Sequence, residues 1–184
     1  MKVLTETEIN EIRKKPKKLH RFEFFSTYVL SEDFIREFQQ ELCEHNWMAI
    51  STINVLSEDS IREFQDKWNW SLISQYQTLS EDFIREFQKK VKWSYISDYQ
   101  TLSEDFIREF QDKVDWEGIS KYQTLSKKFK LEFQDKVDWG WISYSQILSE
   151  DFIREFQDKV DWYYISKYQT LSEDFKLEFK DKLK

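Results

Sequence analysis

The stretch LSEDFIREFQDKVDWEGISKYQT, from Leu102 to Thr124, decides the fold, because near copies of it recur along the chain at a step of about 23 residues. Tryptophan keeps the same step, and a Leu-Ser pair opens each copy. The tryptophans are Trp47, Trp70, Trp93, Trp116, Trp139 and Trp162, and the leucines are Leu56, Leu79, Leu102, Leu125, Leu148 and Leu171. A fixed period of this size predicts a stacked array of small structural repeats.

The first half of the repeat predicts a short amphipathic helix over residues 103–114. Ser103 is a natural N-cap, because its hydroxyl can accept hydrogen bonds from free backbone N–H groups of the first turn. Glu104 and Asp105 then place negative charge at the positive end of the helix dipole. The apolar residues that follow fall on one helical face, and they are Phe106, Ile107, Phe110 and Val114.

The second half predicts another helix over residues 116–123, capped by Asp115. Its inward stripe and the flank of that stripe consist of Trp116, Ile119 and Tyr122. Ser120 is small enough to let two helices approach closely. Because buried amides need partners, we expect Gln123 to satisfy backbone groups at a turn. Each repeat is then a hairpin of two helices, which needs stacked neighbours to complete its core.

These features predict an all-α fold, an α-solenoid of stacked short helix–turn–helix hairpins. The period is about 23 residues, and about 26 residues in the first two repeats. We expect one helical-repeat domain over 1–184, stacked in the right-handed sense by analogy with other helical arrays. Its parts are a degenerate N-terminal repeat at 4–29, regular repeats over 30–170 and a C-terminal half-repeat cap at 171–184.

The composition supports a packed helical core. Hydrophobic residues make up 40% and aromatic residues 18% of the 184 residues, which argues against disorder. Only two glycines and one proline occur, so tight polar turns between helices are favoured over hairpins of strands and long loops. The net charge of −7 disfavours general binding to a nucleic-acid backbone. The lone Cys43 excludes an intramolecular disulfide framework and fits a reducing compartment.

Hydropathy favours a protein that does not enter membranes. The N-terminal segment MKVLTETEIN has no apolar core long enough for a signal peptide. No apolar run approaches the length of about 18 residues that a membrane-spanning helix needs. We therefore expect an intracellular location.

The residues needed for catalytic or metal chemistry are few. His20 and His45 are the two histidines, and neither has metal-ligand spacing with Cys43. A catalytic pair of Cys43 and His45 is disfavoured, because side chains two residues apart on a helix diverge. Carboxylates recur once in every repeat, which is typical of solvated charges and not of a desolvated acid–base pair. We expect no enzymatic activity and no metal or cofactor.

Two lysine clusters stand out in this acidic chain. The first runs from Arg13 to Lys18 around Pro16, which should end the helix that Thr5 and Glu8 begin with a capping box. It is interpreted as a solvated helix C-terminus or as a nuclear-import or anion-contact signal. The second cluster replaces the usual acidic pair and isoleucine of a repeat, and this candidate basic patch consists of Lys127, Lys128 and Lys130.

The repeats differ mainly just after their tryptophan, at three variable positions of the second helix. We expect the first and third positions to face solvent and the second to lie on the flank. Large aromatic side chains at these positions form a candidate protein-binding strip of Tyr95, Trp141, Tyr144, Tyr163 and Tyr164. The alternative is surface drift, together with lateral packing between neighbouring second helices.

The wording of the repeat, LSEDFIREFQDKVDW followed by ISKYQT, resembles the short tandem repeats of uncharacterised proteins encoded by giant viruses of amoebae. The likeness covers Leu30–Lys184 closely and the first repeat weakly. It implies an array protein expressed in an infected host cell, with the host cytoplasm as its expected location. The resemblance implies no catalytic residues.

Three functions remain open at this stage. The first is a non-enzymatic scaffold for protein–protein interaction whose partner is unidentified, and the second is a structural or self-assembling viral component. The third and least supported is nucleic-acid binding through the lysine clusters.

Overall fold

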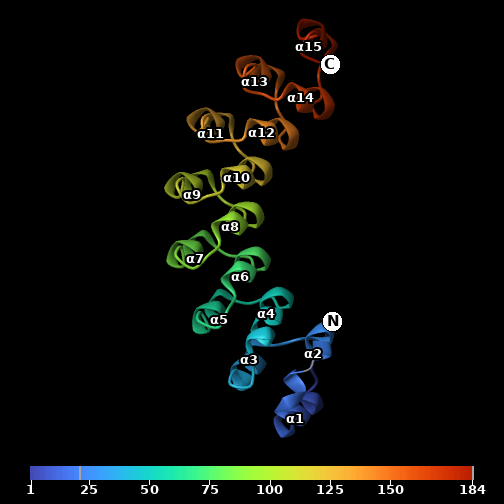
Figure 1. Cartoon of the computed structure of the whole chain (residues 1–184), viewed down its shortest axis with the longest axis vertical. Coiled ribbons are helices and arrows are strands. Elements are labelled where there is room, and N and C mark those ends of the chain that lie inside the picture. The colour runs from blue at the N-terminus through green and yellow to red at the C-terminus, as the bar shows by residue number, and fades with distance from the viewer. Residues whose placement is uncertain (21, 184) are drawn as a thin grey trace. The chain divides into compact units, whose positions relative to one another are not determined.

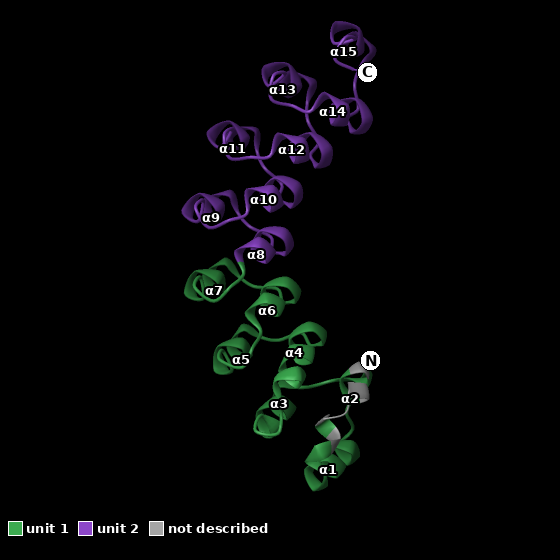
Figure 2. Cartoon of the chain, in the orientation of Figure 1, with its two compact units in different colours: residues 1–92 green, residues 93–184 purple. Residues whose placement is uncertain are grey.

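The computed structural model describes residues 1–20 and 22–183, and the side chains of Lys18, His20, Phe22, Glu23 and Ser26 lie outside the described part. The chain divides into two units, Met1–Lys92 and Trp93–Lys184, which are described separately (Figure 2). Both units consist of short helices in a regular repeating pattern, so the predicted all-α solenoid is confirmed. A single domain over 1–184 stays a prediction.

Unit 1 contains short helices and a small pair of strands. Its elements are β1 (Lys2–Val3), α1 (Glu6–Lys14), the 3-10 helix η1 (Pro16–His20), α2 (Phe22–Thr27), β2 (Tyr28–Val29), α3 (Glu32–Phe38), α4 (Glu44–Ile53), α5 (Glu58–Glu63), α6 (Trp70–Tyr76) and α7 (Glu81–Glu86). The sequence did not predict the strands, which pair in parallel with Lys2 opposite Tyr28. As predicted, α1 ends before Pro16 and begins with the capping box of Thr5 and Glu8.

Unit 2 has the most regular repeats. Its helices are α8 (Trp93–Tyr99), α9 (Glu104–Glu109), α10 (Trp116–Tyr122), α11 (Lys127–Glu132), α12 (Trp139–Ser145), α13 (Glu150–Glu155), α14 (Trp162–Tyr168) and α15 (Glu173–Glu178). Within this unit, α9, α11 and α13 form one row, and α8, α10, α12 and α14 form the other (Figure 1). We call these rows the A helices and the B helices. Consecutive B helices pack against one another.

The predicted N-caps are confirmed in the repeat at 102–124. The Ser103 hydroxyl accepts a 3.1 Å hydrogen bond from the Phe106 backbone N–H at the start of α9. The Asp115 carboxylate accepts bonds from the first backbone N–H groups of α10, the nearer from Glu117 at 3.1 Å. Because each cap satisfies backbone donors that have no partner inside the helix, short helices can begin at fixed residues.

The predicted end of the A helix at residue 114 was wrong. Helix α9 ends at Glu109, where Phe110 takes φ −111° and ψ 27° and leaves the helical conformation. The chain then turns, and the backbone N–H groups of Lys113 and Val114 both donate to the Phe110 carbonyl oxygen. The turn returns Val114 to the core, so its burial fits a longer helix and a turn equally well.

The tryptophan that begins each B helix of unit 2 links its repeat to the next one. The ring of Trp116 of α10 packs against Phe133 and Phe129 of the following repeat, with ring centroids 5.0 and 6.2 Å apart. Its indole N–H donates to the Gln111 carbonyl oxygen at 3.0 Å, so the half-buried ring keeps a polar partner. The same packing recurs at Trp139 and Trp162, and the aromatic residues of successive repeats therefore form one continuous core within unit 2.

The small residues of the B helices set the distance between them. The Ser120 hydroxyl accepts a 2.8 Å hydrogen bond from the Asp138 backbone N–H and donates to the Trp116 carbonyl oxygen at 2.6 Å. A Cβ at Gly118 would collide with the Asp98 carboxylate of α8 and lie only 3.2 Å from Ser97 Cβ. Burial raises the pKa of Asp98 at this close approach.

Candidate functional site

Five aromatic side chains meet on α12 and α14, and we call them the aromatic cluster. Its members are Trp141, Tyr144, Tyr163, Tyr164 and Tyr168. The ring of Tyr144 lies at the centre, 5.5 Å from Trp141, 5.4 Å from Tyr164 and 4.6 Å from Tyr168, measured between centroids. The ring of Tyr163 lies 5.4 Å from that of Tyr164. All four of these contacts are edge-to-face, a geometry that aromatic pairs prefer.

The members of the cluster differ in exposure. Tyr163, Tyr168 and Tyr144 keep 60%, 45% and 40% of their surface accessible. Trp141 and Tyr164 are half-buried, because each reaches across to the neighbouring B helix. The half-buried pair therefore packs laterally between helices, and the three exposed tyrosines remain available to another molecule.

Lysines border the aromatic cluster on two sides. Lys121 of α10 places its Nζ 4.0 Å from the ring centroid of Trp141, whose indole N–H donates to the Glu117 carboxylate at 3.2 Å. Lys167 of α14 lies over the rings of Tyr163 and Tyr168 at 5.5 and 5.3 Å. Contact with tyrosine hydroxyls raises the pKa of both lysines, so both carry positive charge at neutral pH.

The structure brings together four of the five residues in the predicted strip. Trp141, Tyr144, Tyr163 and Tyr164 share the aromatic cluster. Tyr95 lies on α8 and packs instead against Tyr99 of its own helix, with ring centroids 6.0 Å apart. The candidate site is therefore centred on α12 and α14.

Sequence reasoning missed the tyrosine near the end of α6, α8, α10 and α14, where α12 has Ser145 instead. It placed Tyr122 on the flank of the inward stripe, whereas Tyr122 is 54% exposed. Tyr76 and Tyr99 are exposed to a similar degree, and Tyr168 joins the aromatic cluster. Helical geometry could have indicated this exposure. At about 100° per residue, this tyrosine lies about 120° around the helix from the tryptophan of its repeat. That angle is wide enough for the side chain to leave the inward stripe.

The expected exposure of the variable positions was only partly correct. Tyr163 and Glu117 at the first position are exposed, but Ser94 and Gly140 are half-buried. At the third position, Tyr144 and Lys167 are exposed, whereas the half-buried residues are Gln75, Asp98 and Lys121. Neighbouring B helices cover the flanks of each other, which the pattern of one helix cannot indicate.

The predicted basic patch does not form a continuous surface. Lys130 is buried, with 5% of its surface accessible, so this part of the prediction was wrong. Lys127 is exposed and forms an ion pair with Glu155 at 2.6 Å. Lys128 is exposed on the same helix, α11. One buried and one paired lysine among the three leave little basis for a nucleic-acid site in this repeat.

The N-terminal lysine cluster begins in the last turn of α1 and continues beyond it. Arg13 in the last turn of α1 donates to Glu37 at 2.8 Å and to Glu6 at 3.1 Å. Lys14, Lys15 and Lys17 are exposed, whereas the side chains of Lys18 and His20 lie outside the described residues. The positions of these basic residues fit the first interpretation of the cluster, a solvated helix C-terminus whose dipole favours cations.

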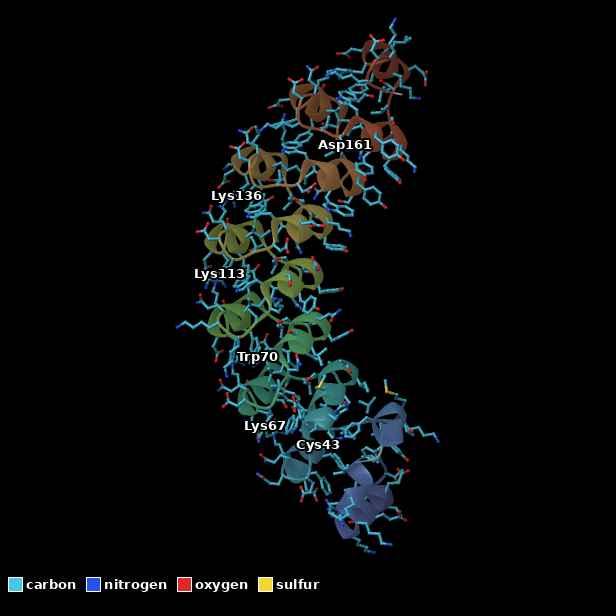
Figure 3. The ribbon with its side chains drawn as sticks, viewed as in Figure 1. Cys43, Lys67, Trp70, Lys113, Lys136 and Asp161 are labelled. Carbon is cyan, nitrogen blue, oxygen red and sulfur yellow. The ribbon has the colours of Figure 1, made fainter. Side chains whose placement is uncertain are left out.

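The lysines that recur once in every repeat belong to the frame. Figure 3 shows Lys113 and Lys136 on the side of unit 2 where the A helices lie. Lys136 donates to Gln111 Oε1 at 2.8 Å, and its Nζ lies 5.7 Å from the ring centroid of Trp116. This lysine therefore connects its repeat to the preceding one.

Cys43 and His45 are both exposed at the start of α4, where Cys43 occupies the N-cap position. In the part of the chain that the structure describes, no group of three or more histidine, cysteine, aspartate and glutamate residues is placed to hold a metal ion. No helix among the described residues is both long and apolar enough to cross a membrane.

Searches of protein-family models, of curated proteins and of solved structures each found no match to this chain. The resemblance of the repeat to tandem repeats of giant viruses stays a prediction.

Proposed function

We propose that this chain is a non-enzymatic helical-repeat scaffold that binds a protein partner through the aromatic cluster. The observation that carries the proposal is the exposure of Tyr144, Tyr163 and Tyr168 by 40% to 60% while their rings contact one another or Tyr164. Tyrosine and tryptophan contribute much of the binding energy at protein interfaces. A solenoid offers a rigid frame for such a surface. The surface therefore loses little conformational entropy when a partner binds.

The charges around the cluster favour a partner with acidic residues at its edge. Lys121 and Lys167 flank the rings, and α12 itself contains no charged residue. Among the acidic first-turn residues, Glu117 of α10 borders the cluster, where its carboxylate accepts from the Trp141 indole N–H. Those of α9 and α13 belong to the A helices, on the other row. Complementary charge at a rim increases the association rate more than the affinity.

The proposal is tested by affinity purification of the tagged chain from its native cell extract, followed by mass spectrometry. The test variant is Tyr144→Ala with Tyr163→Ala, and the matched control is Tyr76→Ala with Tyr99→Ala, which removes two similarly exposed tyrosines outside the cluster. A partner that is recovered with the wild type and the control, but reduced at least tenfold with the test variant, would support the proposal. Equal recovery with all three proteins would contradict it.

A structural or self-assembling role is the second candidate, and one observation favours it. An exposed tyrosine recurs at one position of the repeat, at Tyr76, Tyr99 and Tyr122. A surface that repeats along the chain suits a partner that repeats as well, such as another copy of the array. Light scattering over a range of concentrations separates the two candidates, because only self-assembly makes the molar mass rise with concentration.

A further inference from the structure

Two neighbouring junctions of unit 2 contain equivalent cavities. The first has a volume of about 350 Å³ and is lined by residues 98–102 and 122–124. The second has a volume of about 300 Å³ and is lined by residues 121–125 and 145–147 together with Lys130. Each lining residue of the first cavity has its counterpart in the second, one repeat further along the chain. The two cavities therefore form a matched pair within one chain.

The two cavities differ in charge. The charged lining residue of the first is Asp98, and we call it the aspartate cavity. Its counterpart in the second is Lys121, and Lys130 adds a second positive charge, so we call this one the lysine cavity. The residue equivalent to Lys130 in the preceding repeat is Ile107, which is completely buried.

Lys130 is the unusual member of this site. It keeps only 5% of its surface accessible, yet it stands where the preceding and following repeats have isoleucine. Its Nζ lies 5.3 Å from the ring centroid of Phe152, and among the described residues the structure gives it no hydrogen bond or ion pair. Contact with an aromatic face offsets only part of the cost of removing an ammonium from water.

Glu104 is the carboxylate that influences Lys130, but it does not neutralise it. Its two oxygens already accept hydrogen bonds from the backbone N–H and the hydroxyl of Ser126, at 2.6 and 3.1 Å. Burial lowers the pKa of Lys130, and this effect outweighs the negative charge of Glu104, which raises it. The ammonium therefore lacks a close counter-charge among the described residues and lies at the wall of an open cavity.

We propose that the lysine cavity binds a small organic carboxylate, with the Lys130 and Lys121 ammonium groups as its charge partners. The proposal does not require a protein partner at the aromatic cluster, although Lys121 borders both sites. A carboxylate would supply the counter-charge that Lys130 lacks, and Leu125 and Ile147 provide apolar surface for the rest of the molecule. The volume lies at the lower end of the range of about 300–1,000 Å³ for ligand sites, which limits the ligand to a small molecule.

Isothermal titration calorimetry on the full chain tests the proposal with three anions, acetate, benzoate and inorganic phosphate, and with neutral benzamide. We expect saturable binding of benzoate at one site with a Kd of about 1 mM or tighter. Acetate should bind more weakly than benzoate, because its apolar part is smaller. Phosphate and benzamide should bind at least tenfold more weakly, because phosphate lacks an apolar part and benzamide lacks the charge. Carbon NMR should also show the pKa of Lys130 rising when benzoate is present.

The variants offer matched controls. Lys130→Ile restores the residue of the neighbouring repeats, so we expect it to fold and to bind benzoate at least tenfold more weakly. Lys176 stands at the equivalent position of the last repeat, where it is exposed, and Lys176→Ile should leave binding unchanged. Benzoate affinity within twofold of the wild type in Lys130→Ile would overturn the proposal. So would the absence of saturable benzoate binding, or tighter binding of phosphate than of benzoate.

Discussion

The side-chain amide of Gln123 donates a 2.8 Å hydrogen bond to the backbone carbonyl oxygen of Gln100, and Gln146 bonds to the carbonyl of Gln123 in the same way at 2.7 Å. The Gln123 amide also donates to the Ser97 carbonyl at 3.0 Å and accepts from the Leu102 backbone N–H at 3.1 Å. One buried side chain thus satisfies three backbone groups at the turn that joins two repeats. The predicted role of this glutamine is confirmed.

Replacing Gln123 should therefore weaken the stack. Gln123→Leu leaves three backbone groups without a partner, and we expect a loss of about 3 kcal/mol in the free energy of unfolding. Gln111→Leu is the control. Its half-buried amide donates one long bond of 3.4 Å to a backbone carbonyl and accepts an exposed bond from Lys136 at 2.8 Å, so its loss should cost about 1 kcal/mol. Urea denaturation measures both values. Equal losses would show that the glutamine ladder has no special role.

Lys130→Ile should stabilise unit 2. The substitution removes a buried ammonium and restores the apolar residue of the neighbouring repeats, so we expect a gain of about 1–3 kcal/mol at neutral pH. The reverse change, Ile107→Lys, should destabilise the protein by at least a similar amount. Urea denaturation of each variant beside the wild type provides the measurement.

The same substitution predicts a pH dependence. Because burial lowers the pKa of Lys130, the unfolded chain binds more protons than the folded one between that lowered pKa and the ordinary lysine value of about 10.4. The wild type should therefore gain stability as the pH rises through this window, and the advantage of Lys130→Ile should shrink. Denaturation at pH 7 and near pH 10 compares the two proteins. An advantage that stays constant or grows with pH contradicts a buried ammonium.

Glu8 should titrate far below an ordinary glutamate. Bonds from the Thr5 backbone N–H, at 2.8 Å, and from the Tyr28 hydroxyl, at 2.7 Å, hold the pKa of Glu8 at about 2, against an ordinary value of 4.5. The contribution of the carboxylate to stability is present above pH 4.5 and should be lost as the pH falls toward 2. NMR titration of the carboxyl carbon gives the midpoint directly. A midpoint near 4.5 would show that these bonds do not persist in solution.

Within the aromatic cluster, the loss of stability on substitution should distinguish side chains that pack between helices from those that are free at the surface. Trp141 is half-buried and bonded to Glu117, so we expect Trp141→Ala to cost about 2–3 kcal/mol. Tyr163 is 60% exposed, and Tyr163→Ala should cost less than about 1 kcal/mol. Thermal unfolding of the two variants tests this difference. A large loss for Tyr163→Ala would indicate that the exposed tyrosines serve packing.

Much of the fold was predictable because the repeat contains its own local signals. Ser103 and Asp115 cap the predicted helices, and the buried stripe includes Phe106 and Ile107. The end of α9 was not predictable in this way. Position 114 lies on the buried side whether the chain continues as a helix or turns at Phe110, so hydrophobic periodicity could not separate the two geometries.

The candidate site was less accessible to sequence reasoning, because it depends on contacts between repeats. The variable positions indicated Trp141, Tyr144, Tyr163 and Tyr164, but only the stacking of B helices shows which of them pack and which stay exposed. Lys130 has the same limitation, since an isolated α11 would present its lysine without the Phe152 ring of the next repeat beside it. In both sites, contacts between neighbouring repeats determine which side chains are buried and which stay exposed.

The most direct test of the proposed scaffold is site-specific photo-crosslinking in the native cell. A photoreactive benzoylphenylalanine replaces Tyr163 of the aromatic cluster in one protein and Tyr76, a comparably exposed tyrosine outside it, in the other. We predict a crosslink from position 163 to a different protein, with little or none from position 76. Identical crosslinks from both positions, or crosslinks only to another copy of the chain, would contradict a partner-binding site at the aromatic cluster.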